Sequence, residues 1–129
     1  MKLLLDTHIA LWAITDDVRL TRRARDLILD SGNDIYFSAV NTWEIAIRHS
    51  MGGDVPGTAA EAEADFLLSG YLPLNITPRH TLEVEKLPRL HRDPFDRLLI
   101  AQATVEGMQL LTVDSSIEKY PSSCILMVN

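Results

Sequence analysis

Short apolar runs and longer stretches with helical spacing alternate along the whole chain. Runs rich in Leu, Ile, Val, Tyr and Phe predict buried β-strands. They lie at residues 2–5, 35–37, 71–76, 108–113 and 124–128. The run at 71–76 is the weakest candidate, because Pro73 has no backbone N–H to donate to a neighbouring strand.

Helical spacing fills the stretches between these runs, and the usual end signals mark them. Thr21 is a plausible N-cap, and both Thr77-Pro78 and Asp93-Pro94 place a capping side chain before a proline at the first helical position. The predicted helices are 7–14, 22–30, 40–51, 58–68, 77–87 and 93–106. Alternating strands and helices predict an α/β fold, in which a parallel sheet is covered by helices on both faces. In such sheets, ligands bind beyond the carboxyl ends of the strands.

Length and composition fit one globular domain over residues 1–129. The chain is 47% hydrophobic and 23% charged, has one cysteine, and carries a net charge of −6. A single cysteine forms no internal disulfide, and no apolar stretch approaches the roughly 18 residues of a membrane span, so we expect a cytoplasmic protein with no membrane partner. The acidic balance argues against a protein that grips nucleic acid by bulk positive charge.

Acidic residues stand where a parallel sheet would gather them. Asp6 ends the first strand and Asp114 follows the fourth, while Asp96 lies in the first turn of the helix that begins near residue 93. Glu44 shares the predicted apolar stripe of its helix, formed by Val40, Trp43, Ile47 and Met51. An inward-facing carboxylate is costly unless it is paired, protonated or bound to a metal.

Each acid also has an ordinary structural explanation. Asp93 fits an N-cap, and Asp96 suits the positive end of its helix. Glu44 can pair with Arg48 one turn later, and acids are common in turns after strands. These separate explanations do not account for four acids gathered at the same end of one sheet. Like charges placed that close together repel one another and destabilise the fold unless a cation neutralises them. Oxygen ligands without cysteine suit Mg²⁺ or Mn²⁺, and such ions commonly serve phosphoryl chemistry.

Four segments together resemble the PIN-domain family, and within it the VapC-type toxins of toxin–antitoxin modules. They are LLLDTHIALW, FSAVNTWEIAIR, HRDPFDRLLIAQA and LLTVD, in order from residue 3 to residue 114. The resemblance implies a five-stranded parallel sheet flanked by helices and a Mg²⁺-dependent endoribonuclease, a hydrolase in which Mn²⁺ is a possible substitute. It also implies an RNA substrate, a cognate antitoxin that places a segment in the acidic site, and a homodimer.

The family's four acidic positions correspond to Asp6, Glu44, Asp96 and Asp114. The resemblance implies that the three aspartates hold the metal and that Glu44 ligates or orients the attacking water. It assigns the hydroxyl of Thr112 to the support of the acidic cluster. Where many relatives have a further acid or amide, this chain has Ser116.

Several other residues have supporting or candidate roles. We regard Asp93 as a supporting residue, and Arg48, Arg92 and Arg97 as candidates for contacts with the RNA backbone. His8 follows Asp6 closely, whereas the remaining histidines are expected at the surface or in satisfied positions. Trp12 and Trp43 could stack on bases, although core packing explains them better.

Two other classes of protein remain alternatives. A phosphatase or a phospho-acceptor receiver domain also places carboxylates on a parallel sheet, but a receiver needs paired acids after its first strand and a lysine after its last. A non-catalytic PIN-fold interaction module would retain the fold without the chemistry.

Overall fold

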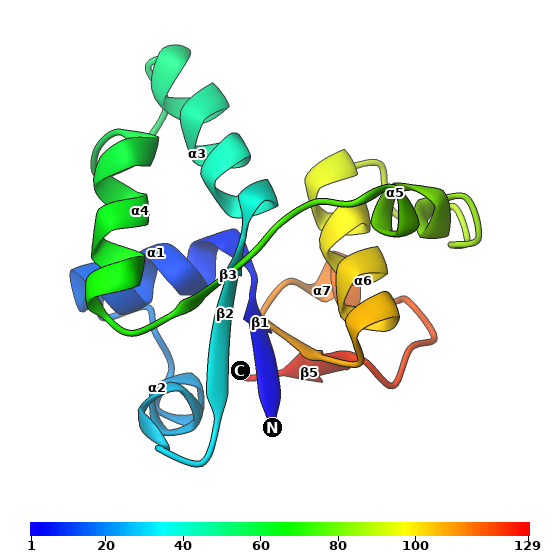
Figure 1. The fold of residues 1–129 in the computed structure, drawn as a ribbon, viewed down its shortest axis with the longest axis horizontal. Helices are drawn as coiled ribbons and strands as arrows, with labels where there is room; N and C mark the ends of the chain where they lie inside the picture. Colours follow the sequence, from blue (N-terminus) through cyan, green and yellow to red (C-terminus); the bar gives the residue numbers. More distant parts are fainter.

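Five parallel strands form the one sheet of the computed structural model, which describes residues 1–129 (Figure 1). The order across the sheet is β3-β2-β1-β4-β5, and every neighbouring pair is parallel, as the sequence predicted. The strands are β1 (Lys2–Leu5), β2 (Asp34–Ser38), β3 (Leu72–Leu74), β4 (Gln109–Thr112) and β5 (Ile125–Met127).

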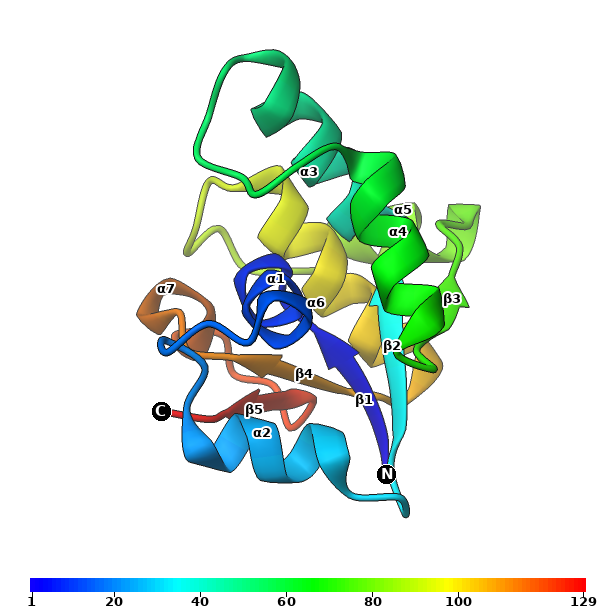
Figure 2. The same cartoon turned by 90° about the vertical axis from the view of Figure 1, so that its left-hand side faces the viewer.

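Helices cover both faces of this sheet (Figures 1 and 2). They are α1 (Thr7–Thr15), α2 (Arg22–Leu29), α3 (Ala39–Ser50), α4 (Ala59–Leu68), α5 (Pro78–Val84), α6 (Pro94–Glu106) and α7 (Ser115–Glu118). None of them has the length and apolar character that crossing a membrane requires. Along β1 the side chains alternate, so that Leu3 and Leu5 join one apolar cluster, with α1, α2 and α4, while Leu4 joins the other, with α6 and α7.

Three elements differ from the sequence prediction. The strand β3 has only 3 residues, and its Pro73 is tolerated because β3 is an edge strand that pairs with β2 alone. The helix α5 ends at Val84, and turns replace the predicted helix over 85–87. The short helix α7 was not predicted; Asp114 caps it by accepting a hydrogen bond from the N–H of Ser116.

The predicted apolar stripe of α3 is partly wrong. Val40 is buried, but Trp43 is 46% exposed and Met51, the residue that follows the helix, is 79% exposed. The outer end of α3 extends beyond the sheet (Figure 1). The buried face runs instead through Val40, Asn41, Glu44 and Ile45. Glu44 therefore faces inward as expected, although on a different stripe.

Buried polar side chains fix the start of α3 against the end of β1. Ser38 caps the helix by accepting from the N–H of Val40, and the Asn41 Oδ1 accepts from the N–H of Ser38. The Asn41 amide donates to the Leu5 carbonyl at 3.1 Å and to the Thr7 hydroxyl at 2.9 Å. Because these groups are buried and paired, the first turn of α3 is held at the carboxyl end of β1.

Candidate active site

The carboxyl ends of β1 and β4 bring three of the predicted site residues together. Leu5 and Leu111 are paired in the parallel register, so Asp6 and Thr112 follow side by side. The Thr112 hydroxyl donates to the Asp6 Oδ2 at 2.8 Å and accepts from the N–H of Asp114 at 3.0 Å. Asp114 itself is half-buried, and its Oδ1 accepts from the N–H of Ser116. One hydroxyl thus fixes both strand ends.

Glu44 reaches this edge of the sheet from α3. Its side chain is 4% exposed, and its Oε2 lies 2.7 Å from the Nη2 of Arg48, one turn later. This is the ion pair that helical spacing suggested, but on a buried rather than a solvated face. The other oxygen, Oε1, is buried without a hydrogen-bond partner. A buried carboxylate oxygen in this state can accept from a ligand or bind a cation.

Asp96 enters from the first turn of α6. The preceding Asp93 is the N-cap, as expected, since its Oδ1 accepts from the N–H groups of Phe95 and Asp96. The Asp96 side chain is left to face the site, where its Oδ2 lies 2.8 Å from the Nε2 of His91. Sequence analysis did not assign His91 to the site. Its position five residues before Asp96, between Arg89 and Arg92 in the sequence, was the only signal for it.

Burial and mutual repulsion make two of these acids weak. Burial raises the pKa of Asp6 to about 6; the nearby charge of Glu44 adds to the rise, while the Thr112 hydrogen bond and the charge of His8 oppose it. Burial also raises the pKa of Asp96 to about 7, and the charge of Asp6 adds to it. Smaller contributions from Asp93 and Asp114 act in the same direction. Asp6 thus feels the charge of Glu44, and Asp96 feels the charges of Asp6 and Asp114, which links the four predicted acids in one cluster.

The tightest group of potential metal ligands is not the predicted one. The ligand atoms of His91, Asp93 and Asp96 lie within 4.8 Å of one another, and no other group of three or more does so. The predicted set of Asp6, Asp96 and Asp114 is more widely spaced. One Asp93 oxygen already caps α6, and the His91 ring is hydrogen-bonded to Asp96. Local structure therefore explains most of this compact group.

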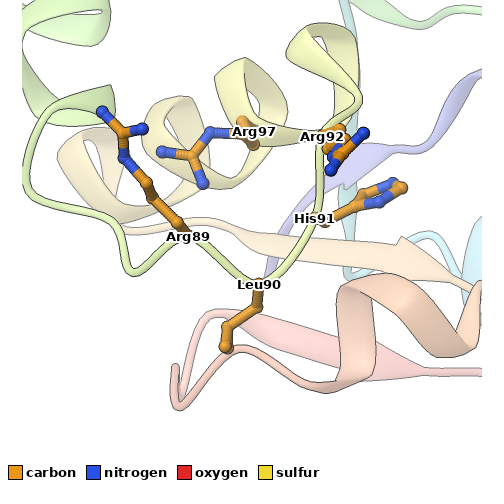
Figure 3. Close-up of a pocket in the computed structure, with 5 residues that line it drawn as sticks. All are labelled: Arg89, Leu90, His91, Arg92 and Arg97. Atoms are coloured by element: carbon orange, nitrogen blue, oxygen red, sulfur yellow. The ribbon is translucent and has the colours of Figure 1, made fainter.

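A basic loop, residues 88–92, borders the acidic cluster and lines a surface hollow of about 820 Å³ with Arg97 (Figure 3). Arg89 and Arg97 lie on one side of the loop, Arg92 and His91 on the other, and Leu90 points away. The Arg97 guanidinium donates to the carbonyls of Pro88 and Val84 and to the hydroxyl of Tyr120. It is thus occupied in holding the loop, whereas Arg89 and Arg92 are exposed.

Comparison with known proteins identifies this arrangement. The family model of the PIN domain matches residues 3–122. The chain belongs to the PIN-domain family. Its members are typically metal-dependent nucleases. No curated protein matches the chain in sequence.

Two solved structures share the fold over its whole length. One is VapBC2 from Rickettsia felis bound to a DNA fragment from its promoter, with 17% identity, a TM-score of 0.72 and 100% coverage of both chains. The other is DNA-bound VapBC from Salmonella typhimurium, with 14% identity, a TM-score of 0.71, and coverage of 100% of this chain and 99% of that one. At such identities the likeness establishes the fold, and the predicted resemblance to VapC-type proteins is confirmed at that level.

Proposed function

We propose that this PIN domain is a Mg²⁺-dependent endoribonuclease and the toxin of a toxin–antitoxin pair. The observation that carries the proposal is the crowding of buried acids at one sheet edge: Asp6 and Asp96 have raised pKa values, and Glu44 has a buried oxygen without a partner. Such crowding destabilises a fold unless a cation offsets it. The potential metal ligands at this edge are mainly carboxylate oxygens, which suit Mg²⁺ and also Mn²⁺.

Asp6, Asp96 and Asp114 are the residues that would hold the ion, and Glu44 would ligate it or orient the attacking water. When bound, Mg²⁺ supplies activation of water and neutralisation of charge on the phosphate. Thr112 and His91 hold the carboxylates of Asp6 and Asp96 in place through hydrogen bonds of 2.8 Å each. Positioned carboxylates and a positioned water favour in-line hydrolysis of a phosphodiester, which leaves a 3′ hydroxyl and a 5′ phosphate.

Arg48 and Arg92 are the proposed contacts to the RNA backbone. Arg48 keeps 41% of its side chain exposed while it pairs with Glu44, and Arg92 is exposed beside His91. Arg48 thus lies beside Glu44, and Arg92 follows His91, the partner of Asp96, so each brings positive charge near an acid that a phosphate would approach. Arg97 is the weakest of the three candidates, because its donors already serve Pro88, Val84 and Tyr120.

A cognate antitoxin and a second copy of the chain are the proposed protein partners. The fold is shared with two proteins whose structures are VapBC complexes, which supports an antitoxin that covers the acidic edge. A chain with net charge −6 favours a basic partner segment. An RNA-cleaving toxin of this kind acts in the cytoplasm.

Cleavage of a mixed RNA pool tests the proposal. Purified protein without antitoxin is incubated with Mg²⁺, with Mn²⁺ or with chelator, beside Asp96→Asn and the exposed control Asp26→Asn. We expect cleavage with either ion, none with chelator, and a loss of at least a hundredfold in Asp96→Asn alone, because the ion loses a ligand. Folded protein that neither binds metal nor cuts RNA would instead support the non-catalytic interaction module.

A further inference from the structure

A second hollow, of about 280 Å³, shares no lining residue with the hollow at the basic loop. It is lined by α1, by the turn that follows α1, by the outer half of α3, and by the connection between α3 and α4; Figure 2 shows these elements around α1. The side chains that matter for the argument are His8, Trp12, Arg19, Arg48 and Asp54.

This hollow adjoins the proposed active site through two of its walls. Arg48 lines it and also lies 2.7 Å from the buried Glu44 carboxylate. His8 lines it as well, one helical turn before Trp12 and close enough to Asp6 for its charge to act on that carboxylate. A molecule in the hollow would therefore lie next to whatever the acids bind.

The walls of the hollow are aromatic and cationic. The ring centroids of His8 and Trp12 are 5.8 Å apart, with an angle of 38° between the planes, and the Arg19 guanidinium carbon lies 5.2 Å from the Trp12 centroid. Trp12 is partly buried against the apolar core, which confirms the packing role expected from sequence and fixes its orientation. Aromatic rings and guanidinium planes of this kind stack on nucleobases without regard to sequence.

Polar groups of both signs complete the lining. Arg19 is paired with Asp17 and Arg48 with Glu44, yet their side chains are 61% and 41% exposed, so donors of each guanidinium remain available. Asp54 is exposed and offers acceptor oxygens. Unpaired bases present stacking faces together with N–H donors and carbonyl acceptors on their edges. A purely apolar ligand would not use the remaining donors of the two arginines, and an isolated phosphate would not use the rings.

We propose that this hollow binds one unpaired nucleobase of the RNA substrate, next to the phosphate held at the acidic edge. The proposal rests on the ribonuclease function proposed above. It names the substrate class more closely: a single-stranded or looped region, with a base turned out beside the scissile phosphate. His8 and Trp12 act as the stacking wall, and Arg19 and Arg48 face the adjoining backbone.

Trp12 itself can report the binding. The chain has two tryptophans, so Trp43→Phe leaves Trp12 as the only one. In that background, with Asp96→Asn to prevent cleavage, hexamers of A, C, G and U and an abasic hexamer are titrated in Mg²⁺ while Trp12 fluorescence is recorded. We expect the base-bearing hexamers to quench Trp12 and to bind about tenfold more tightly than the abasic one. His8→Ala should remove most of that advantage, whereas His49→Ala, an exposed histidine at the outer end of α3, should not.

Cleavage of the RNA pool by Trp43→Phe alone separates the two proposals. If this protein cuts RNA but Trp12 is not quenched and the abasic hexamer binds as tightly as the others, the nucleobase site is wrong and the ribonuclease stands. If Trp12 is quenched by bases but no RNA is cut with any metal, the site stands as a base-binding site and the ribonuclease is wrong. The site is also wrong if His8→Ala still binds the base-bearing hexamers more tightly than the abasic one by the same factor.

Discussion

The Thr112 hydroxyl donates to the Asp6 carboxylate at 2.8 Å, across 106 positions of sequence. Both residues are buried, and the same hydroxyl accepts from the N–H of Asp114. The contact therefore connects the ends of two neighbouring strands and orients one acid towards the site. Asp6 keeps a raised pKa in spite of this bond, because burial outweighs it.

Replacement of Thr112 by valine should lower both stability and metal binding. Valine has the same shape but leaves the Asp6 carboxylate and the Asp114 N–H without their shared partner, at a cost of about 1–3 kcal/mol of unfolding free energy. Denaturant unfolding with and without Mg²⁺ measures both effects. Thr104→Val is the matched control, since the Thr104 hydroxyl bonds only to a carbonyl of its own helix. Equal losses in the two variants would remove the special role of Thr112, and Thr112→Ser should restore most of the binding.

The metal-free protein should lose stability as pH rises, and Asp96→Asn should relieve the loss. The Asp96 carboxyl has an ordinary pKa of 3.8, and its pKa in the folded protein is about 7. Between these two pH values the native state keeps a proton that the unfolded chain has released. Stability contributed by the protonated form is complete below pH 4 and is lost as pH rises through 7. The amide does not titrate. The gain in Tm of Asp96→Asn should thus be small at pH 4 and largest near pH 7.5.

The control for this pH series is Asp26→Asn on the exposed surface of α2. The difference in Tm between this variant and the natural protein should stay nearly constant with pH. A constant difference for Asp96→Asn as well would mean that Asp96 is not held as a weak acid in the native state. The series is recorded in chelator, since a bound cation would itself favour the charged carboxylate.

Mg²⁺ or Mn²⁺ should stabilise the natural protein and not its site variants. At an ion concentration of one hundred times the Kd, the expected gain is about 2.7 kcal/mol, which corresponds to a rise in Tm of several degrees. Asp6→Asn and Asp96→Asn should be more stable than the natural protein in chelator at pH 7.5 and gain little from the ion. Asp26→Asn should gain as much as the natural protein. If Mg²⁺ raised the Tm of Asp96→Asn as much as that of the natural protein, the ion would bind at a site other than the one formed by Asp6, Asp96 and Asp114.

Much of the architecture could be predicted because local signals agreed with the tertiary structure. Thr21 and Asp93 cap helices where their positions suggested, and short apolar runs became strands of one parallel sheet. The predicted buried stripe of α3 was partly wrong because helical spacing identifies residues on one face of a helix but not which part of that face is covered by the rest of the protein. Since the outer end of α3 extends past the sheet, Met51 has no neighbour to bury it.

The candidate site was only partly predictable for a related reason. Asp6 and Asp114 follow strands directly, so topology alone places them at one edge. The contact of His91 with Asp96 depends on the path of an irregular loop, which no periodic pattern encodes. The hydrogen bonds of Arg97 could not be predicted for the same reason, since a free surface arginine and one that holds a loop look alike in the sequence.

Arg97→Leu should loosen the loop that carries His91 while the rest of the fold persists. The substitution removes the donors to the carbonyls of Pro88 and Val84, so hydrogen exchange in residues 85–92 should become at least tenfold faster, with little change in the sheet. Tyr120→Phe deletes one acceptor of the same guanidinium and should give a smaller effect in the same residues. Arg92→Ala, which removes an exposed side chain from the same loop, should leave exchange unchanged. Uniform exchange in all three variants would show that the loop is held by its own turns, and that Arg97 remains available to the RNA.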